Sequence, residues 1–474
     1  MTHTFDMVVL GGGIGGYTAA IRAAQLGKNV AIVEQDKLGG TCLHRGCIPS
    51  KALLRSAEVF ALMKDSDRFG IGAEAVTLDF SKVASRKDAV VEQLYSGLQF
   101  LMKKHKITVF QGKGRLIGPS IFSPRSGTVS VDQGDDEILT LVPEKVVIAT
   151  GSRPRSLPGL ETDGVTILNS DEALRLEKLP TSAVIIGGGV IGVEWASLLS
   201  DFGVQVTVVE FAPRLLPSED EDVSRELERL LKKRGVSVRT GTKVLTESVR
   251  KHEGGVTLNV EHREEQAELS AEIALVCVGR QANVEGIGLE NTDVKVEGGF
   301  VRVNDSMQTA ELHIYAVGDC IGGLQLAHAA AHEGLTAAEH AWGLQPHKVE
   351  PHRVPRCVYS RPETASIGWT EREAKERGRD VKVSKVHFRA LGKAIVLGET
   401  DGFIKVVADK ETNDLLGVHM IGPHVTDYIS EAALAQLLDA TPWEIGQTIH
   451  PHPTLSELLG EAMLAVDGRS INMM

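Results

Sequence analysis

Short apolar runs alternate along the chain with longer segments in which small apolar residues are mixed with polar ones. Residues 5–10 are mostly apolar, three glycines follow, and an alanine-rich segment then extends to Gly27. A second apolar run occupies residues 30–33 and ends at Glu34. Short apolar runs next to glycine are typical of strands buried in a parallel sheet, and the alanine-rich segment has the length of a helix. Residues 5–34 are therefore predicted to form a strand, a helix and a second strand.

This unit is repeated later in the chain. Apolar residues 182–186 precede a second glycine run, a helix is expected to about Phe202, and another apolar strand covers residues 206–209. The two copies align without a gap, and each has glycines spaced Gly-x-Gly-x-x-Gly and a glutamate at the end of its second strand. Two unrelated turns would rarely both carry every part of this motif, so we predict two dinucleotide-binding sites. The repeated positions are Gly11, Gly13, Gly16 and Glu34 in the first copy and Gly187, Gly189, Gly192 and Glu210 in the second.

The motif indicates how each unit would bind its ligand. The glycines let the backbone approach a pyrophosphate, which rests against the helix N-terminus, and the glutamate accepts hydrogen bonds from a ribose. Two dinucleotides in one chain indicate electron transfer between them, such as between FAD and a nicotinamide. Glu210 would repel the 2′-phosphate of NADP, which favours NAD at the second site, although Arg214 lies nearby and weakens that preference.

Two of the five cysteines, Cys42 and Cys47, fall close together in a glycine-bounded turn at residues 39–51. Glycine allows such a turn to bring two sulfurs together, and Pro49 suits the first turn of a helix, which places Cys47 where thiolate is favoured. The pair is either redox-active or simply two small buried residues. Because a flavin accepts electrons from a thiolate, the position of the pair just after the first unit assigns FAD to that unit and NAD to the second. No second cysteine group completes a zinc site, so no metal is expected.

Three further apolar strands end in turns that a cofactor could contact, at residues 146–149, 274–278 and 313–317. The last of these leads to Asp319, which would either accept a hydrogen bond from a sugar hydroxyl of the flavin or be an ordinary turn residue. A long alanine-rich helix follows, and the positive end of its dipole could face the flavin. The candidate contacts in these segments are Thr150, Gly151, Gly279, Asp319 and Ala327.

The composition changes near residue 349, where prolines precede alternating, strand-like runs. Residues 403–408 and 415–421 are predicted to form a hairpin, and the Gly-x-Gly-x-x-Gly motif does not occur again. We therefore predict an α/β chain with two Rossmann-like nucleotide-binding domains and a third, different domain. The predicted ranges are 1–150 with 276–348 for the FAD-binding domain, 151–275 for the NAD-binding domain and 349–474 for the third domain.

The third domain ends with two histidines held between prolines, His450 and His452. Proline restricts the backbone, so a histidine held here could serve as the general base for a thiol pair. Glu457 is the candidate to orient the imidazole. The same segment also fits a helix capping box in which Glu457 bonds the backbone N–H of Thr454, and the local sequence favours this second interpretation.

Composition narrows the classes of function. A net charge of −12 disfavours nucleic acid as a partner. No apolar run reaches the length of about 18 residues that a membrane span needs. Five cysteines do not suggest a secreted disulfide framework, and residues 1–4 lead almost directly into a strand without a charged and apolar leader. A cytoplasmic protein is therefore expected.

Together these residues resemble the flavin-dependent disulfide oxidoreductases over nearly the whole chain. The most specific matches are the turn from Gly-Gly-Thr-Cys42 to Gly-Cys47-Ile-Pro-Ser-Lys51 and the C-terminal run His452-Pro-Thr-Leu-Ser-Glu457. Within the family these motifs are most similar to those of the branch that oxidises dihydrolipoamide. Two positions depart from the common pattern, because His44-Arg45 replaces an asparagine-led pair and Ala282 stands where proline is usual.

The resemblance implies a third domain of α+β type that forms a homodimer, and it implies a mechanism. His452, contributed by the other subunit, would deprotonate dihydrolipoamide. The substrate thiolate would attack Cys42, Cys47 would be released beside FAD, and the electrons would pass to NAD. Lys51 and Glu194 would form an ion pair beside the reactive edge of the flavin. The implied partner is the lipoylated acyltransferase subunit of a 2-oxo acid dehydrogenase complex.

Three other functions stay open at this point. The sequence also fits a reductase that uses NADPH to act on another disulfide or a metal ion. It fits an NADH oxidase of the same fold that does not need the cysteines. A flavoprotein that only docks in a multienzyme assembly is the third, although the cysteine pair and His452 argue against a loss of catalysis.

Overall fold

The structure, a computed structural model, describes residues 2–119, 125–134 and 138–472. The chain divides into two compact units. The boundary between them falls inside helices α3 (Cys47–Lys64) and α4 (Phe80–Lys104). The first unit comprises residues 1–52, 84–155 and 280–351, and the second comprises residues 53–83, 156–279 and 352–474.

The first unit is built on a seven-stranded sheet in the order β3-β2-β1-β6-β5-β4, with β19 also paired to β6. β1 runs parallel to β2 and β6, as the predicted strand–helix–strand unit requires. β6 is longer than the apolar run at residues 146–149, because its first half pairs antiparallel with β5. The strands are β1 (Thr2–Leu10), β2 (Val30–Glu34), β3 (Thr108–Gln111), β4 (Lys113–Ile117), β5 (Thr128–Asp132), β6 (Ile138–Ile148) and β19 (Ile314–Ala316).

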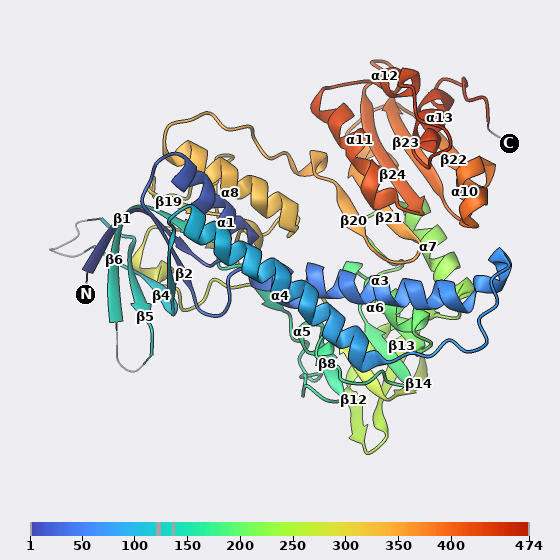
Figure 1. The fold of residues 1–474 in the computed structure, drawn as a ribbon, viewed down its shortest axis with the longest axis horizontal. Coiled ribbons are helices and arrows are strands. Elements are labelled where there is room, and N and C mark those ends of the chain that lie inside the picture. The colour runs from blue at the N-terminus through green and yellow to red at the C-terminus, as the bar shows by residue number, and fades with distance from the viewer. Residues whose placement is uncertain (1, 120–124, 135–137, 473–474) are drawn as a thin grey trace. The chain divides into compact units, whose positions relative to one another are not determined.

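Two alanine-rich helices, α1 (Ile14–Gln25) and α8 (Ala327–Ala341), lie side by side in this unit (Figure 1). Small residues make the contact close, since a Cβ added at Gly334 would come within 2.4 Å of the carbonyl oxygen of Gly15. Buried alanines of both helices share one core with the apolar side chains of β1 and β2. A pair of smaller strands, β7 (Ser152–Pro154) and β16 (Arg280–Ala282), joins two turns of the same unit.

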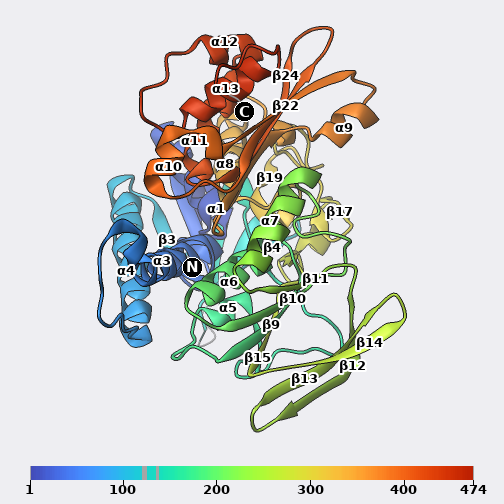
Figure 2. The same cartoon turned by 90° about the vertical axis from the view of Figure 1, so that its right-hand side faces the viewer.

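The second unit contains a parallel sheet in the order β11-β10-β9-β15-β8 and an antiparallel sheet of β12, β13 and β14 (Figure 2). Helix α6 (Val190–Asp201) follows β9 and is buried along most of its length, as the repeated motif predicts. Helix α7 (Glu221–Lys233) follows β10. The strands are β8 (Ile167–Asn169), β9 (Ser182–Ile186), β10 (Gln205–Val209), β11 (Ser237–Arg239), β12 (Lys243–His252), β13 (Gly255–His262), β14 (Glu265–Ala271) and β15 (Ile273–Val276).

The C-terminal part of the second unit is an antiparallel sheet in the order β20-β21-β24-β23-β22. β23 and β24 pair as the predicted hairpin. Helices α11 and α13 pack on this sheet through one apolar core, and Figure 1 shows both beside β22, β23 and β24. The elements are β20 (Arg356–Val358), β21 (Glu363–Gly368), β22 (Val381–His387), β23 (Phe403–Asp409), β24 (Leu415–Gly422), α9 (Glu371–Glu376), α10 (Gly392–Leu397), α11 (Val425–Leu437), α12 (Pro442–Gln447) and α13 (Glu457–Ala465).

One face of this sheet carries a row of polar residues in register across all five strands. The Nζ of Lys405, whose side chain is 4% exposed, lies 3.1 Å from both Asp220 and Asp222, at the start of α7. Arg356 at the edge of the row bonds Glu219 at 3.0 Å. A buried ammonium group is costly unless it is paired, so these contacts fix the sheet against the start of α7. The row consists of Arg356, Ser366, His419, Lys405 and Lys385.

The predicted α/β architecture, with two Rossmann-like units and a mixed C-terminal domain, is confirmed by these sheets. The assignment of FAD and NAD to the ranges given above stays a prediction. Throughout the described ranges, every helix is too short or too polar to cross a membrane. The described side chains also contain no group of three or more potential ligands arranged to hold a metal ion.

Candidate active site

Cys42 and Cys47 form a disulfide, with their Cα atoms 4.7 Å apart. The predicted turn is in fact a short helix, α2 (Gly40–Arg45), which is separated from α3 by Gly46. Gly39 precedes α2 with a φ of +104°, a conformation that glycine adopts without strain. Cys47 is the first residue of α3, which agrees with its predicted position close to a helix N-terminus, so the helix dipole favours its thiolate once the disulfide opens.

The unusual pair between the cysteines has local partners. The ring of His44 lies 2.7 Å from the carbonyl oxygen of Leu38 through Nε2 and packs edge-on against Tyr95. Arg45 forms an ion pair with Asp36 at 3.1 Å. These contacts tie α2 to the end of the first nucleotide-binding motif, so His44 and Arg45 help to hold the disulfide in place.

The first glycine motif forms a cradle at the N-terminus of α1. Gly11 has a φ of +102°, and an added Cβ would come within 2.3 Å of the carbonyl oxygen of Ala149, so only glycine fits there. The Oε2 atom of Glu34 accepts the backbone N–H of Gly12 at 2.7 Å. No described atom lies within 4 Å of a Cβ added at Gly13, the N-cap of α1. This open approach to helix N–H groups fits a pyrophosphate.

The second motif repeats the cradle at α6. An added Cβ at Gly187 would come within 2.2 Å of the carbonyl oxygen of Cys277, and the position of Gly189 is as open as that of Gly13. Glu210 accepts the backbone N–H groups of Gly188 and Ala212. The residues present therefore fit a second dinucleotide.

Arg214, which could have favoured NADP, is engaged elsewhere. Its guanidinium forms an ion pair with Glu221 at 2.8 Å and donates to the carbonyl oxygen of Pro217 at 2.6 Å. Glu210 therefore remains the charged residue at the end of β10, and it would repel a 2′-phosphate.

Asp319 is held by residues that sequence reasoning missed. The hydroxyl of Ser152 donates to its carboxylate, and Nε of Arg280 donates to the Ser152 hydroxyl at 2.7 Å. Strands β7 and β16 bring the turns after Gly151 and Gly279 together, which is why the three side chains meet. Both turns were predicted as cofactor contacts. In each turn an arginine follows the glycine within two residues, and this repeated pattern could have indicated the polar side chains that meet here.

The neighbouring predicted contacts lie in the same unit. The hydroxyl of Thr150 donates to the carbonyl oxygen of Asn283 at 2.6 Å, and Ala327 is the first residue of α8. The carboxylate of Glu333, also on α8, accepts the N–H of Gly318 at 2.7 Å and so holds the turn that carries Asp319.

Glu194 is buried on α6, and its Oε1 accepts the backbone N–H of Tyr359 at 3.0 Å. It is therefore not simply an acid on an exposed helix face. Lys51 lies on α3 in the first unit. The ion pair between Lys51 and Glu194 stays a prediction.

His452 has the geometry of an oriented base. Its Nδ1 lies 2.8 Å from Oε1 of Glu457, and its side chain is 78% exposed. Oε2 of Glu457 accepts the backbone N–H of Thr454 at 2.7 Å, so one carboxylate both orients the histidine and makes half of the capping box. Burial opposes ionisation of Glu457, but the bonds from Thr454 and His452 lower its pKa. The Thr454 hydroxyl bonds Pro451 instead, and α13 begins at Glu457 without a side-chain cap.

The other histidine of this segment is placed differently. His450 is nearly buried, and its Nε2 lies 2.8 Å from Glu431 of α11. The hydrogen bond to Glu431 raises the pKa of His450. Its ring packs on α13 at Gly460, where an added Cβ would come within 2.8 Å of the ring. His450 thus anchors the segment, and Glu431 is a partner that no local sequence pattern predicts.

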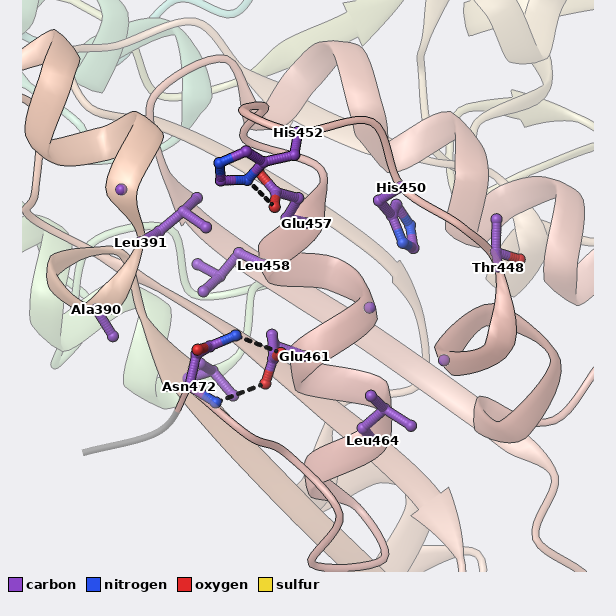
Figure 3. Close-up of a pocket in the computed structure, with 14 residues that line it drawn as sticks. Ala390, Leu391, Thr448, His450, His452, Glu457, Leu458, Glu461, Leu464 and Asn472 are labelled. Atoms are coloured by element: carbon purple, nitrogen blue, oxygen red, sulfur yellow. Dashed lines mark hydrogen bonds and ion pairs between the residues drawn. The ribbon is translucent and has the colours of Figure 1, made fainter.

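Residues of this segment line a cavity of about 310 Å³ in the second unit. Figure 3 shows Leu391 and Leu458 between His452 and Asn472, and it shows Glu461 beside Asn472. The cavity therefore offers an imidazole, an apolar surface and an amide.

The cysteines outside the disulfide turn include two that are chemically inert. Cys277 and Cys320 are buried, and desolvation raises the pKa of each thiol to about 12. Cys277 and Cys320 are therefore core residues and take no part in the thiol chemistry of the disulfide turn.

Comparison with known proteins gives consistent relatives. The chain is 60% identical over 473 residues, covering 100% of both chains, to a protein of Bacillus subtilis named dihydrolipoyl dehydrogenase. It superposes on a crystal structure of LpdA from Mycobacterium tuberculosis with a TM-score of 0.90 at 27% identity, covering 97% of this chain and 99% of the other. A flavoprotein disulfide reductase of Escherichia coli, RclA, gives a TM-score of 0.84 at 28% identity over 97% of this chain and 99% of that chain.

Family comparison covers most of the sequence. Residues 5–334 match the pyridine nucleotide-disulphide oxidoreductases, and residues 354–463 match the dimerisation domain of the same proteins. The chain belongs to the pyridine nucleotide-disulphide oxidoreductase family.

Proposed function

We propose that this protein oxidises dihydrolipoyl groups and reduces NAD⁺ to NADH, as a dihydrolipoyl dehydrogenase. The observation that carries the proposal is the Cys42–Cys47 disulfide that directly follows the first of two dinucleotide cradles. The name of the 60% identical relative over the full length supports the same reaction.

The cysteines and the histidine have distinct roles in this reaction. Nδ1 of His452 is held by Glu457, so Nε2 takes the proton from a substrate thiol. The substrate thiolate attacks the sulfur of Cys42, the bond to Cys47 breaks, and Cys47 leaves as a thiolate. The second substrate thiol then displaces Cys42, which gives a closed lipoyl disulfide and a reduced cysteine pair. Because the side chain of His452 is exposed, it can contact a substrate that approaches from outside its own subunit.

FAD and NAD are the cofactors of this reaction. The chemistry that bound FAD supplies is the transfer of two electrons from the cysteine pair to NAD⁺ as hydride. The residues that would hold FAD are Gly11, Gly13, Gly16, Glu34, Lys51, Thr150, Gly151, Asp319 and Ala327. The residues that would hold NAD are Gly187, Gly189, Gly192, Glu194, Glu210 and Gly279.

The dimerisation-domain match supports a homodimer. In the proposed assembly His452 serves the disulfide of the second subunit, so an isolated subunit would lack a complete thiol site. The proposed partner is the lipoylated acyltransferase subunit of a 2-oxo acid dehydrogenase complex, and the proposed location is the cytoplasm.

The test compares substrates and oligomeric state. Purified, flavin-loaded protein is assayed with dihydrolipoamide and NAD⁺, and separately with glutathione disulfide and NADPH. The proposal expects turnover with the first pair and little with the second, and the reverse preference would contradict it. Sedimentation of the active species checks the dimer, because full activity in a monomer is incompatible with a shared site.

A further inference from the structure

The last described residues turn back along α13 and bring Asn472 to the edge of the cavity that contains His452. α13 ends at Ala465, and Gly468, with a φ of +68°, reverses the chain. The N–H of Gly468 bonds the carbonyl oxygen of Ala465, which closes the turn. Residues 469–472 are called the C-terminal strap below.

Glu461 anchors the C-terminal strap with one carboxylate. It accepts the backbone N–H groups of Ile471 and Asn472 at 3.0 and 3.2 Å, the side-chain amide of Asn472 at 2.9 Å, and the hydroxyl of Ser470. Burial opposes ionisation, but these donors lower the pKa of Glu461, so it is charged near neutral pH. Hydrogen bonds to an ionised carboxylate are roughly twice as strong as neutral ones, so the anchor is firm.

The same helix holds both the proposed base and the C-terminal strap. Glu457 orients His452, and Glu461 lies one turn further along α13 on the same face, because residues four apart are neighbours on a helix surface. Both carboxylates line the cavity. The position of Asn472 is therefore fixed relative to His452 by one rigid element.

The order of chemical groups along the cavity matches the proposed substrate. A dihydrolipoyl group has a dithiol at one end, an alkyl chain, and an amide at the other end. The cavity presents His452, then the apolar Leu391 and Leu458, and then the amide of Asn472 (Figure 3). Its volume of about 310 Å³ is within the range of sites for small ligands.

We propose that the C-terminal strap is a specificity-determining wall of the substrate site, which recognises the alkyl chain and amide of the dithiol. This inference rests on the proposed function. It assigns Glu461 as the positioning residue and Asn472 as the residue that contacts substrate.

The first experiment compares two dithiols in full-length, flavin-loaded protein. In Glu461→Ala the C-terminal strap is released, and KM for dihydrolipoamide should rise roughly tenfold with kcat unchanged, because binding contacts are lost without touching the base. KM for dithiothreitol, which lacks the alkyl tail and the amide of dihydrolipoamide, should stay the same. Asp467→Asn is the matched control, since it breaks only the ion pair with Lys382 just before the C-terminal strap, and both KM values should be unchanged.

The second experiment does not depend on activity. Carboxypeptidase should release the C-terminal residues faster from Glu461→Ala than from the unmodified protein or Asp467→Asn. Glu461→Gln keeps the shape of the side chain, and it should change both release and KM in the same direction but less, which covers the case in which the alanine variant fails to fold.

Several results would overturn the proposal. If Glu461→Ala leaves the release rate unchanged, Glu461 is not the anchor of the C-terminal strap. If release is faster but KM for dihydrolipoamide is unchanged, the C-terminal strap is not part of the substrate site. An equal rise in KM for both dithiols would show that the C-terminal strap does not recognise the alkyl chain and amide. Weaker dimerisation in sedimentation without a change in dithiol preference would assign the C-terminal strap to an interface with a second copy. Failure of the proposed function is seen separately, as no NAD⁺ reduction with dihydrolipoamide in the unmodified protein.

Discussion

The two nucleotide-binding units are alike at their glycine turns and differ in what surrounds them. Gly11 and Gly187 have φ values of +102° and +110°, and a Cβ at either would strike the carbonyl oxygen of the neighbouring strand end. The carboxylates of Glu34 and Glu210 each accept the backbone N–H of the residue that follows the first motif glycine, Gly12 or Gly188. The likeness extends to single hydrogen bonds, so both units are suited to the same class of ligand.

The differences begin immediately after each motif. The first motif leads into α2 and the disulfide, whereas the second leads into a loop whose Arg214 is turned toward Glu221. Helix α1 buries small residues against α8, whereas α6 buries Trp195 and Glu194. The comparison teaches that the glycine motif decides which kind of ligand binds, and that the neighbouring residues decide which chemistry is done with it.

The largest expected effect comes from removing the Cys42–Cys47 disulfide, which only the first unit has. Cys47→Ser should lower dihydrolipoamide–NAD⁺ activity by about a thousandfold or more, because the disulfide can no longer form. NADH-dependent reduction of ferricyanide, which bypasses the disulfide, should persist and serves as the control. Retained dithiol turnover would mean that the two units do not differ in the way described.

The next largest effect distinguishes the unit that binds FAD from the unit that binds NAD. A Cβ at Gly16 would lie 2.0 Å from the carbonyl oxygen of Gly11, and one at Gly192 would lie 1.9 Å from that of Gly187. Gly16→Ala and Gly192→Ala should each destabilise their own cradle by about 1–3 kcal/mol or more. Fluorescence of released flavin should rise for Gly16→Ala, and KM for NAD⁺ should rise for Gly192→Ala. The opposite pattern would exchange the two cofactor assignments.

A smaller effect follows from neutralising the two glutamates. Glu34→Gln and Glu210→Gln keep the side-chain shape but weaken a charge-assisted hydrogen bond. Glu34→Gln should therefore weaken the binding of FAD about tenfold, and Glu210→Gln should weaken the binding of NAD⁺ about tenfold. Equilibrium dialysis and KM for NAD⁺ measure the two effects. Glu210→Gln should also narrow the preference for NAD⁺ over NADP⁺, and an unchanged preference would shift that role to another residue.

The smallest expected effect compares the cysteines of the first unit, Cys42 and Cys47, with Cys277, which directly follows β15 in the second unit. After reduction with a dithiol at pH 8, iodoacetamide should modify Cys42 and Cys47. Cys277 should stay unmodified, because burial raises the pKa of its thiol to about 12 and little thiolate is present. Peptide mass spectrometry counts the modified sites, with unreduced protein as the control.

Much of this arrangement could be predicted from the sequence, because it depends on residues close together in the chain. Local patterns predict the glycine motifs, the hairpin at β23 and β24, and a helix that begins close to Cys47. The prediction of a simple turn around Cys42 missed α2, since six residues between glycines give too little periodicity to identify a helix.

Contacts between distant segments could not be predicted. Glu431 meets His450 from another helix, and Ser152 meets Arg280 only because β7 pairs with β16. The choice between a cap and an orienting group for Glu457 also could not be made locally. The structure gives one oxygen of the carboxylate to each role.

The polar row across the C-terminal sheet has a consequence for the order in which the protein is made. Glu219 and Asp220 leave the ribosome well before their partners in the row, Arg356 and Lys405. Until then these carboxylates must stay hydrated, because an unpaired buried charge costs several kcal/mol. We therefore expect the loop before α7 to take its final form only after the last sheet is synthesised. A chain that stops before residue 405 lacks the ammonium group that pairs with Asp220, so this part of the second unit stays incomplete.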